Sequence, residues 1–270
     1  GKIGIEMGKA FNKKKWHWWP SYSAITEDSN NKNIVSSVNT TYWPEAKQNG
    51  VRVYTDKQVF KIILNENGLC EGVLYKDKTG KEYLCKSKII ILACNGVGTP
   101  RLLLNSKSKN FPKGLLNNND IVGKNLMLHP LAYIEGCFNK NLYSSVGPHG
   151  CCIFSQEFYE TRAENNFYRG YTMQVLRGSN PIETAISGYL TRQISLGKKH
   201  HEDFRKLFNR TVGIAVISED LPNLKNRVEL DRKNKDRYGM PGVKIHYELD
   251  ENTIKILKHG VRMSKEVLTS

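Results

Sequence analysis

The sequence at residues 88–104 reads KIIILACNGVGTPRLLL and decides the choice of fold class. Residues 89–94 form an unbroken apolar run, which is typical of a strand buried on both faces of a parallel sheet. Two glycines follow at once, and then a Thr-Pro pair that suits the first positions of a helix. The stretch therefore predicts a parallel strand over residues 88–94, a tight glycine turn and a helix over residues 99–106, as in α/β folds.

A strand, a glycine turn and a helix together direct backbone N–H groups and a helix N-terminus toward one edge of the sheet. Nucleotides and flavins bind at such an edge. The pattern is not the full dinucleotide fingerprint, because Arg101 stands where a third glycine belongs. The same turn can also be purely structural, so both interpretations stay open. Gly96 is the candidate residue, since a side chain there would obstruct either a special backbone conformation or a close approach of a cofactor.

The segments before this stretch indicate a small antiparallel meander. Three short strands are predicted within residues 58–88, separated by Asn-Gly and Thr-Gly turns. A further strand is predicted over residues 51–55, and a helix over residues 38–48. The chain opens with a short basic helix, followed by an aromatic cluster that ends at Pro20.

After Pro130 the pattern becomes that of a second, largely antiparallel region. The predicted strands there are residues 131–138, 150–154, 170–177 and 210–218, with a hairpin over 227–231 and 243–249. Apolar residues at helical spacing predict a final helix over residues 251–268, with Asp250 as its cap. The sequence thus predicts an α/β region followed by a region built on an antiparallel sheet.

Composition limits the classes of function. The chain of 270 residues carries a net charge of +15, from 41 Lys and Arg against 26 Asp and Glu. The excess is spread as +9 over residues 1–135 and +6 over residues 136–270, which is unlike the clustered footprint of a nucleic-acid-binding protein. Six cysteines show no metal-ligand spacing, so no metal site is expected, and they do not decide between the cytoplasm and a bacterial periplasm. The longest apolar run is too short for a membrane span.

Several blocks of the chain resemble the glucose–methanol–choline (GMC) family of flavoprotein oxidoreductases, and they occur in the family's order. They are TYWPEA at 41–46, GVRVYT at 50–55, ILACNGVGTPRLLLNS at 91–106, VGKNLMLHP at 122–130, NRVELD at 226–231 and VKIHYEL at 243–249. The glycine block and the VGKNL…HP block are each fairly specific. The chain is most similar to the bacterial dehydrogenase branch, which acts on sugars, sugar acids or sorbitol-type alcohols.

This resemblance implies an FAD enzyme that oxidises a CH–OH group of an alcohol, sugar or sugar acid by hydride transfer to the flavin. It implies a Rossmann-like FAD-binding domain and a substrate domain with an antiparallel sheet. By the same resemblance, Val59 meets the adenine through its backbone, and Ala93 and Gly96 lie along the cofactor. A quinone or a cytochrome is the implied type of electron-acceptor partner.

The chain also departs from the family pattern. The first glycine fingerprint is absent, and the catalytic histidine block is expected C-terminal to Ser270, so the chain is expected to be a central fragment that is inactive alone and holds FAD weakly. The expected domains are a partial FAD-binding domain over residues 1–129, a substrate domain over 130–250, and a helix over 251–270 that leads back to the missing C-terminal part. The alternative function is a noncatalytic basic module that binds nucleic acid or a protein partner.

Overall fold

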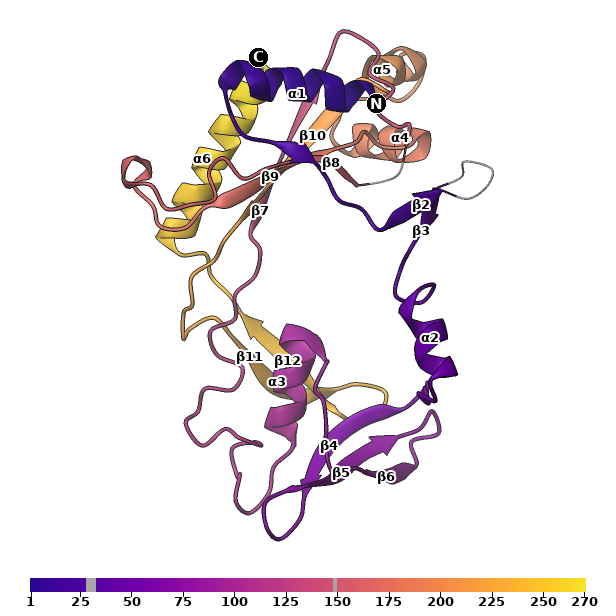
Figure 1. Cartoon of the computed structure of the whole chain (residues 1–270), viewed down its shortest axis with the longest axis vertical. Helices are drawn as coiled ribbons and strands as arrows, with labels where there is room; N and C mark the ends of the chain where they lie inside the picture. Colours follow the sequence, from indigo (N-terminus) through magenta and orange to yellow (C-terminus); the bar gives the residue numbers. More distant parts are fainter. Residues whose placement is uncertain (28–32, 148–149) are drawn as a thin grey trace. The chain divides into compact units, whose positions relative to one another are not determined.

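The chain forms two compact units, each assembled from segments that are far apart in the sequence. The structure, a computed structural model, describes residues 1–27, 33–147 and 150–270 (Figure 1). Unit 1 comprises residues 1–44, 129–220 and 249–270, and unit 2 comprises residues 45–128 and 221–248. The chain therefore passes between the units four times.

Unit 1 is built on a five-stranded antiparallel sheet. The strand order is β1 (Trp19–Pro20), β8 (Cys151–Ser155), β9 (Tyr171–Leu176), β10 (Thr211–Ser218) and β7 (Leu131–Cys137). The strands predicted between residues 131 and 218 are thus confirmed within one or two residues. Strand β9 shows the alternation on which these predictions rest. Tyr171, Met173 and Val175 are buried, and the residues between them are not.

Two helices cover one face of this sheet. They are α1 (Lys2–Lys14), which packs on β8, and α6 (Glu251–Leu268), which packs on β7, β9 and β10 (Figure 1). Helix α6 begins where Asp250 accepts a hydrogen bond from the backbone of Thr253, so the predicted helix and its cap are confirmed. The core between sheet and helices contains Val175, Ile214 and Ile256, all fully buried.

The remaining elements of unit 1 are short. They are the antiparallel pair β2 (Ile25–Glu27) and β3 (Asn33–Val35), the single 3-10 turn η1 (Ala163–Asn165), α4 (Pro181–Leu190) and α5 (His200–Leu207). Helix α2 (Tyr42–Gln48) crosses the boundary between the units, and none of its residues is buried. Along the described part of the chain, no helix is both long enough and apolar enough to cross a membrane.

Unit 2 contains the predicted meander and hairpin. Strands β4 (Gln58–Leu64), β5 (Cys70–Lys76) and β6 (Glu82–Lys86) form one sheet, and β11 (Arg227–Lys235) pairs with β12 (Pro241–His246). The two predicted turns have glycines at positive φ, 77° at Gly68 and 86° at Gly80. Both expectations are confirmed.

The parallel strand predicted over residues 88–94 is not formed. These residues have no regular secondary structure, and the same holds for the strand predicted over 51–55. Ile90 and Leu92 pack against the cluster around Ile62 and Leu102, but Ile89 and Ile91 are 78% and 86% exposed. An apolar run favours burial, but a strand also needs a neighbouring strand to pair with, and none of the described strands pairs with these residues.

Helix α3 (Asn95–Asn105) starts four residues earlier than predicted, with Cys94 rather than Thr99 as its N-cap. Asn95, the first residue of α3, has a left-handed φ of 63°, and Gly96 has no positive φ. Asparagine tolerates this left-handed conformation better than most residues with a side chain. The tight turn is therefore made by Asn95, and the glycines that were expected to make it belong to the helix.

The predicted division at residues 129 and 250 lies close to two of the four crossings between the units. In the structure, residues 1–44 fold with unit 1, and the hairpin β11–β12 packs on α3 of unit 2. This division into units depends on contacts between segments that are far apart in the sequence. Local sequence patterns do not predict such contacts. A cofactor-binding role for one part and a substrate-binding role for the other remain predictions.

Candidate functional site

The start of helix α3 offers an exposed backbone surface. Gly96 is exposed, and a Cβ added to it would meet no atom within 4 Å. Its N–H group donates to the Asn95 side-chain oxygen at 2.6 Å. The fold itself therefore has no need of a glycine at position 96, which removes the purely conformational reason for it. Space left free at an exposed helix start fits the approach of a flat or anionic group such as a flavin cofactor.

The other two predicted cofactor residues lie on neighbouring segments. Val59 is half-buried in β4, and its carbonyl accepts a hydrogen bond from the Gln58 side chain at 3.2 Å. Ala93 is exposed and immediately follows Leu92, which packs in the same apolar cluster as Val59. The structure thus brings β4 and the residues before α3 together. The contacts of Val59, Ala93 and Gly96 with FAD stay predictions.

Arg101 has a role that sequence reasoning missed. Its guanidinium donates to the Pro241 carbonyl at 2.7 Å and to the Asp236 carboxylate at 2.8 Å. Burial would raise the pKa of Asp236, but the Arg101 hydrogen bond and two backbone N–H groups outweigh it and lower that pKa. The side chain therefore fastens α3 to the turn of the β11–β12 hairpin. No local pattern could have shown a pairing between residues 135 positions apart.

The sheet of unit 1 has a second face, opposite α1 and α6. One row of directly paired residues crosses it, formed by Trp19, Phe154, Gln174, Ala215 and Tyr133. Directly paired residues point to the same side of a sheet. Aromatic and amide groups therefore share this face, where they could stack on and hydrogen-bond a hydroxylated molecule.

Tyr133 is held in place on this face. Its ring lies against Gly213, where a Cβ would come within 2.3 Å of the phenol oxygen. Burial, together with the nearby Glu135 carboxylate, raises the pKa of Tyr133 to about 12. The phenol is therefore protonated at neutral pH, and it donates a long hydrogen bond of 3.4 Å to the Glu135 carboxylate.

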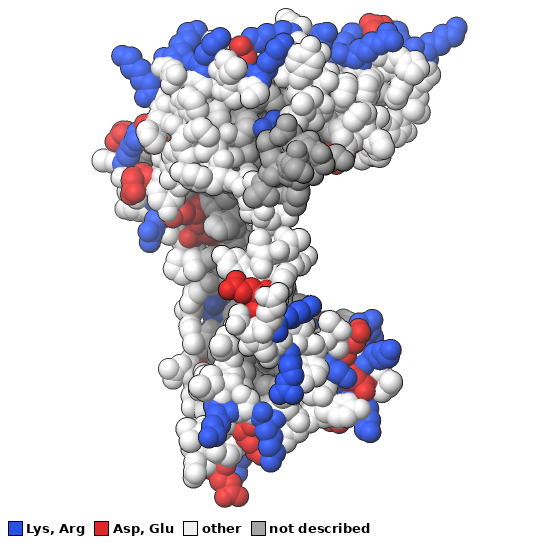
Figure 2. Space-filling model, turned by 45° about the vertical axis from the view of Figure 1, so that its right-hand side comes forward, with Lys and Arg blue, Asp and Glu red and all other residues white. Residues whose placement is uncertain are grey.

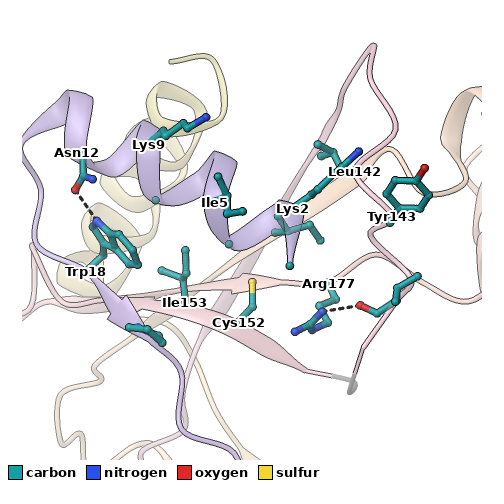
Figure 3. A pocket seen from close by; sticks show the side chains of 16 residues that line it. Lys2, Ile5, Lys9, Asn12, Trp18, Leu142, Tyr143, Cys152, Ile153 and Arg177 are labelled. Atoms are coloured by element: carbon teal, nitrogen blue, oxygen red, sulfur yellow. Dashed lines mark hydrogen bonds between the residues drawn. The ribbon is translucent and has the colours of Figure 1, made fainter. Parts of the chain in front are cut away.

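One cavity lies in unit 1, between α1 and β8 (Figure 3). Its volume is about 580 Å³. Ile5, Ile153 and Trp18 give it mainly apolar walls, and Arg177, whose guanidinium donates to the Val146 carbonyl at 2.6 Å, lies at one end. Ile153 belongs to the helix-covered side of the sheet, so this cavity is on the opposite side from the Tyr133 row.

The basic residues do not form an unopposed patch. Figure 2 shows Lys and Arg gathered along the edge of unit 1 where α1 lies, and mixed with acidic residues over unit 2. On α1, Lys14 pairs with Glu266 at 3.0 Å, and Glu6 pairs with both Lys9 and Lys140. Two carboxylates, Glu6 and Glu266, therefore offset part of the positive charge at this edge.

Comparison with known proteins identifies the class. Residues 10–131 match the family model described as GMC oxidoreductase. The chain is 32% identical to 2-methyl-1,2-propanediol dehydrogenase of Mycolicibacterium austroafricanum, over 97% of this chain and 50% of that protein. It is 23% identical to the fructose dehydrogenase large subunit of Gluconobacter japonicus, over 77% of this chain and 37% of that protein. It is also 23% identical to 6'''-hydroxyparomomycin C oxidase of Streptomyces lividus, over 80% of this chain and 36% of that protein.

The chain belongs to the GMC oxidoreductase family, as its sequence blocks indicated. FAD is the cofactor of this family, so the expected cofactor is confirmed at that level. The chain spans half or less of the length of the curated relatives it matches.

Proposed function

We propose that this chain forms part of an FAD-dependent enzyme that oxidises a CH–OH group of an alcohol, diol or sugar. The observation that carries the proposal is the exposed start of α3, where Gly96 leaves its side-chain position empty although the fold does not require it. Family membership supports the same cofactor. Bound FAD supplies an acceptor for the hydride that leaves the carbinol carbon.

The residues of this chain hold the cofactor in the proposal. Gly96 admits it close to the backbone of α3, and Val59 and Ala93 border it along β4 and the segment before the helix. Arg101 keeps α3 at a fixed position on the β11–β12 hairpin through its bonds to Asp236 and Pro241. The group that takes the hydroxyl proton is not assigned to any residue of this chain, and inactivity of the chain alone stays a prediction.

Substrate recognition is proposed for the face of the unit 1 sheet opposite α1 and α6. The relatives are named for 2-methyl-1,2-propanediol, fructose and 6'''-hydroxyparomomycin C, all of which carry hydroxyl groups. In the proposal, the protonated Tyr133 phenol exchanges its 3.4 Å hydrogen bond to Glu135 for one to such a hydroxyl, and the Gln174 amide both donates and accepts. One relative is named as a large subunit, which supports an acceptor protein or a quinone as the partner that reoxidises the flavin.

Anaerobic mixing tests the proposal. The full-length enzyme that contains this chain is loaded with FAD and mixed with 2-methyl-1,2-propanediol, fructose or sorbitol, and the visible absorbance of oxidised flavin is followed. We expect at least one of these compounds to bleach the flavin. Tyr133→Phe should raise the substrate concentration needed for half-maximal bleaching several-fold, because one donor is lost. The matched Tyr22→Phe variant, at a side chain 85% exposed, should not change it. Equal behaviour of both variants would contradict the assigned face.

A further inference from the structure

A second described cavity lies wholly within unit 2 and differs in character from the apolar one in unit 1. It has a volume of about 440 Å³ and is bounded by the end of α3, the loop that follows it and strand β11. Five cationic side chains line it, namely Lys107, Lys113, Lys124, Arg227 and Arg232. This size falls within the range of small-ligand sites.

The walls of this cavity are fixed by internal contacts. The side chain of Asn117 is buried, accepts from the Val122 N–H at 2.9 Å and donates to the Lys113 carbonyl at 3.2 Å. At Gly123 the loop touches β11, since the Val228 N–H donates to the Gly123 carbonyl at 2.7 Å. Gly123 has φ of 87°, and a Cβ there would lie 2.3 Å from the Val228 oxygen. The cationic groups are thus carried by a preorganised frame.

The charge inside the cavity is not balanced. Its two carboxylates are already paired, Asp120 with Lys124 at 2.8 Å and Glu229 with Arg227. Lys124 lowers the pKa of Asp120, with a smaller contribution from Lys113, and Arg227 lowers the pKa of Glu229, so both carboxyls are ionised at neutral pH. Within residues 1–27, 33–147 and 150–270, no carboxylate lies within 4.0 Å of the cationic atoms of Lys107, Lys113 or Arg232.

Three unpaired cations around one rigid, polar cavity form a complementary surface for several negative oxygens at once. Arginine matches a carboxylate or phosphate with two parallel hydrogen bonds, and lysine adds point charge. A single monovalent anion would neutralise only one of these three positive charges. An extended polyanion would also meet the carboxylates of Asp120 and Glu229.

We propose that this cavity binds a small multivalent oxyanion, one that carries two or more phosphate or carboxylate groups. The site lies on α3, its following loop and β11, and it is separate from the exposed start of α3 to which FAD is assigned. Lys113 and Arg232 are its principal anion-binding residues, and Lys107 contributes a third charge.

Calorimetric titration of the 270-residue chain tests the proposal. Sodium pyrophosphate, sodium citrate and sodium acetate are used as probes at constant ionic strength. Saturable binding of pyrophosphate or citrate, at least tenfold tighter than acetate, is the expected result, and the tighter of the two identifies the preferred oxyanion. Absence of saturable binding for both, or equal affinity for acetate, would overturn the proposal.

Matched variants locate the binding. Lys113→Ala with Arg232→Ala should weaken it at least tenfold. Lys109→Ala with Lys233→Ala removes the same charge from exposed positions outside the cavity and should change it less than twofold. If the Lys113→Ala/Arg232→Ala double variant lacks the circular dichroism of the folded chain, the single variants Lys113→Gln and Arg232→Gln are measured instead. Each single variant should bind the anion at least threefold more weakly.

Two results would overturn the assignment. Equal weakening in both double variants would show a general effect of net charge. Displacement of the bound anion by FAD would show that the cavity belongs to the cofactor site.

Discussion

Units 1 and 2 bury their apolar residues to very different degrees. In unit 1, sixteen described apolar residues form one buried cluster. In unit 2, the corresponding cluster has four. Unit 2 also leaves large apolar side chains exposed, at Val51, Val53, Tyr54, Ile89 and Ile91. The difference is larger than the difference in length between the units.

The comparison shows what a buried-strand pattern means. In unit 1, strands β8, β9 and β10 have a hydrogen-bonded neighbour on both sides, and the alternating apolar residues pack into one core. In unit 2, the apolar run at residues 88–94 has one side packed on β4 and α3 and the other side exposed. An apolar run favours burial, but it forms a β-strand only where a neighbouring strand is present to pair with its backbone.

The largest expected effect is a cavity in the core of unit 1. Ile214 is fully buried at the centre of β10. Ile214→Ala should lower the free energy of unfolding by about 2–5 kcal/mol, because it removes buried methylene groups and leaves a void. Denaturant titration followed by circular dichroism measures it. A loss below about 1 kcal/mol would show that unit 1 is not the well-packed body described.

A helix cap in unit 1 should matter less. Both carboxylate oxygens of Asp250 are bonded to Thr253, at 2.9 Å from its N–H and 2.8 Å from its hydroxyl. Asp250→Ala should cost about 0.5–2 kcal/mol, and Asp250→Asn, which keeps an acceptor, should recover most of it. The same denaturant titration distinguishes them. Equal losses for the two variants would exclude capping as the role of Asp250.

Much of the fold was predictable from local signals. The strands of unit 1 follow from alternation, the meander from its turn glycines, and α6 from its stripe and cap. The Arg101–Asp236 bond and the discontinuous units depend on segments more than a hundred residues apart. At the candidate site, the sequence predicted that Gly96 lies in a tight turn before a helix at residue 99, whereas Gly96 lies in the first turn of α3 and the left-handed residue is Asn95. The local pattern allowed either residue to make the turn.

A pH effect is expected in the meander of unit 2. Hydrogen bonds from Thr79, aided by Tyr83 and the Lys81 N–H, lower the pKa of Asp77 from 3.8 to about 2. Because the pKa of Asp77 is lower in the folded state, its ionised carboxylate stabilises the fold at pH values above the unfolded pKa of 3.8. This contribution is lost as the pH falls through the folded pKa of about 2. Carboxyl chemical shifts should show the low pKa. The Asp77→Asn variant should lack this part of the acid sensitivity, and an Asp77 titration near 3.8 would contradict the turn geometry.

The smallest effect is expected at the exposed side of unit 2. Ile91→Ala makes the same substitution as Ile214→Ala, but the side chain is 86% exposed. The free energy of unfolding should change by no more than about 0.5 kcal/mol. A loss comparable to that of Ile214→Ala would mean that Ile91 is buried in solution, and the contrast between the units would no longer hold.

The proposed cofactor contact is tested most directly at Gly96. A Cβ at this position meets no atom of the chain, so Gly96→Val should leave the circular dichroism almost unchanged. If FAD approaches the start of α3, the added side chain should raise the FAD dissociation constant at least tenfold, a change of about 1.4 kcal/mol. Titration of FAD into the protein, with flavin absorbance measured per folded molecule, gives this value. Unchanged FAD affinity in a folded Gly96→Val variant would contradict the assignment of the cofactor to this helix.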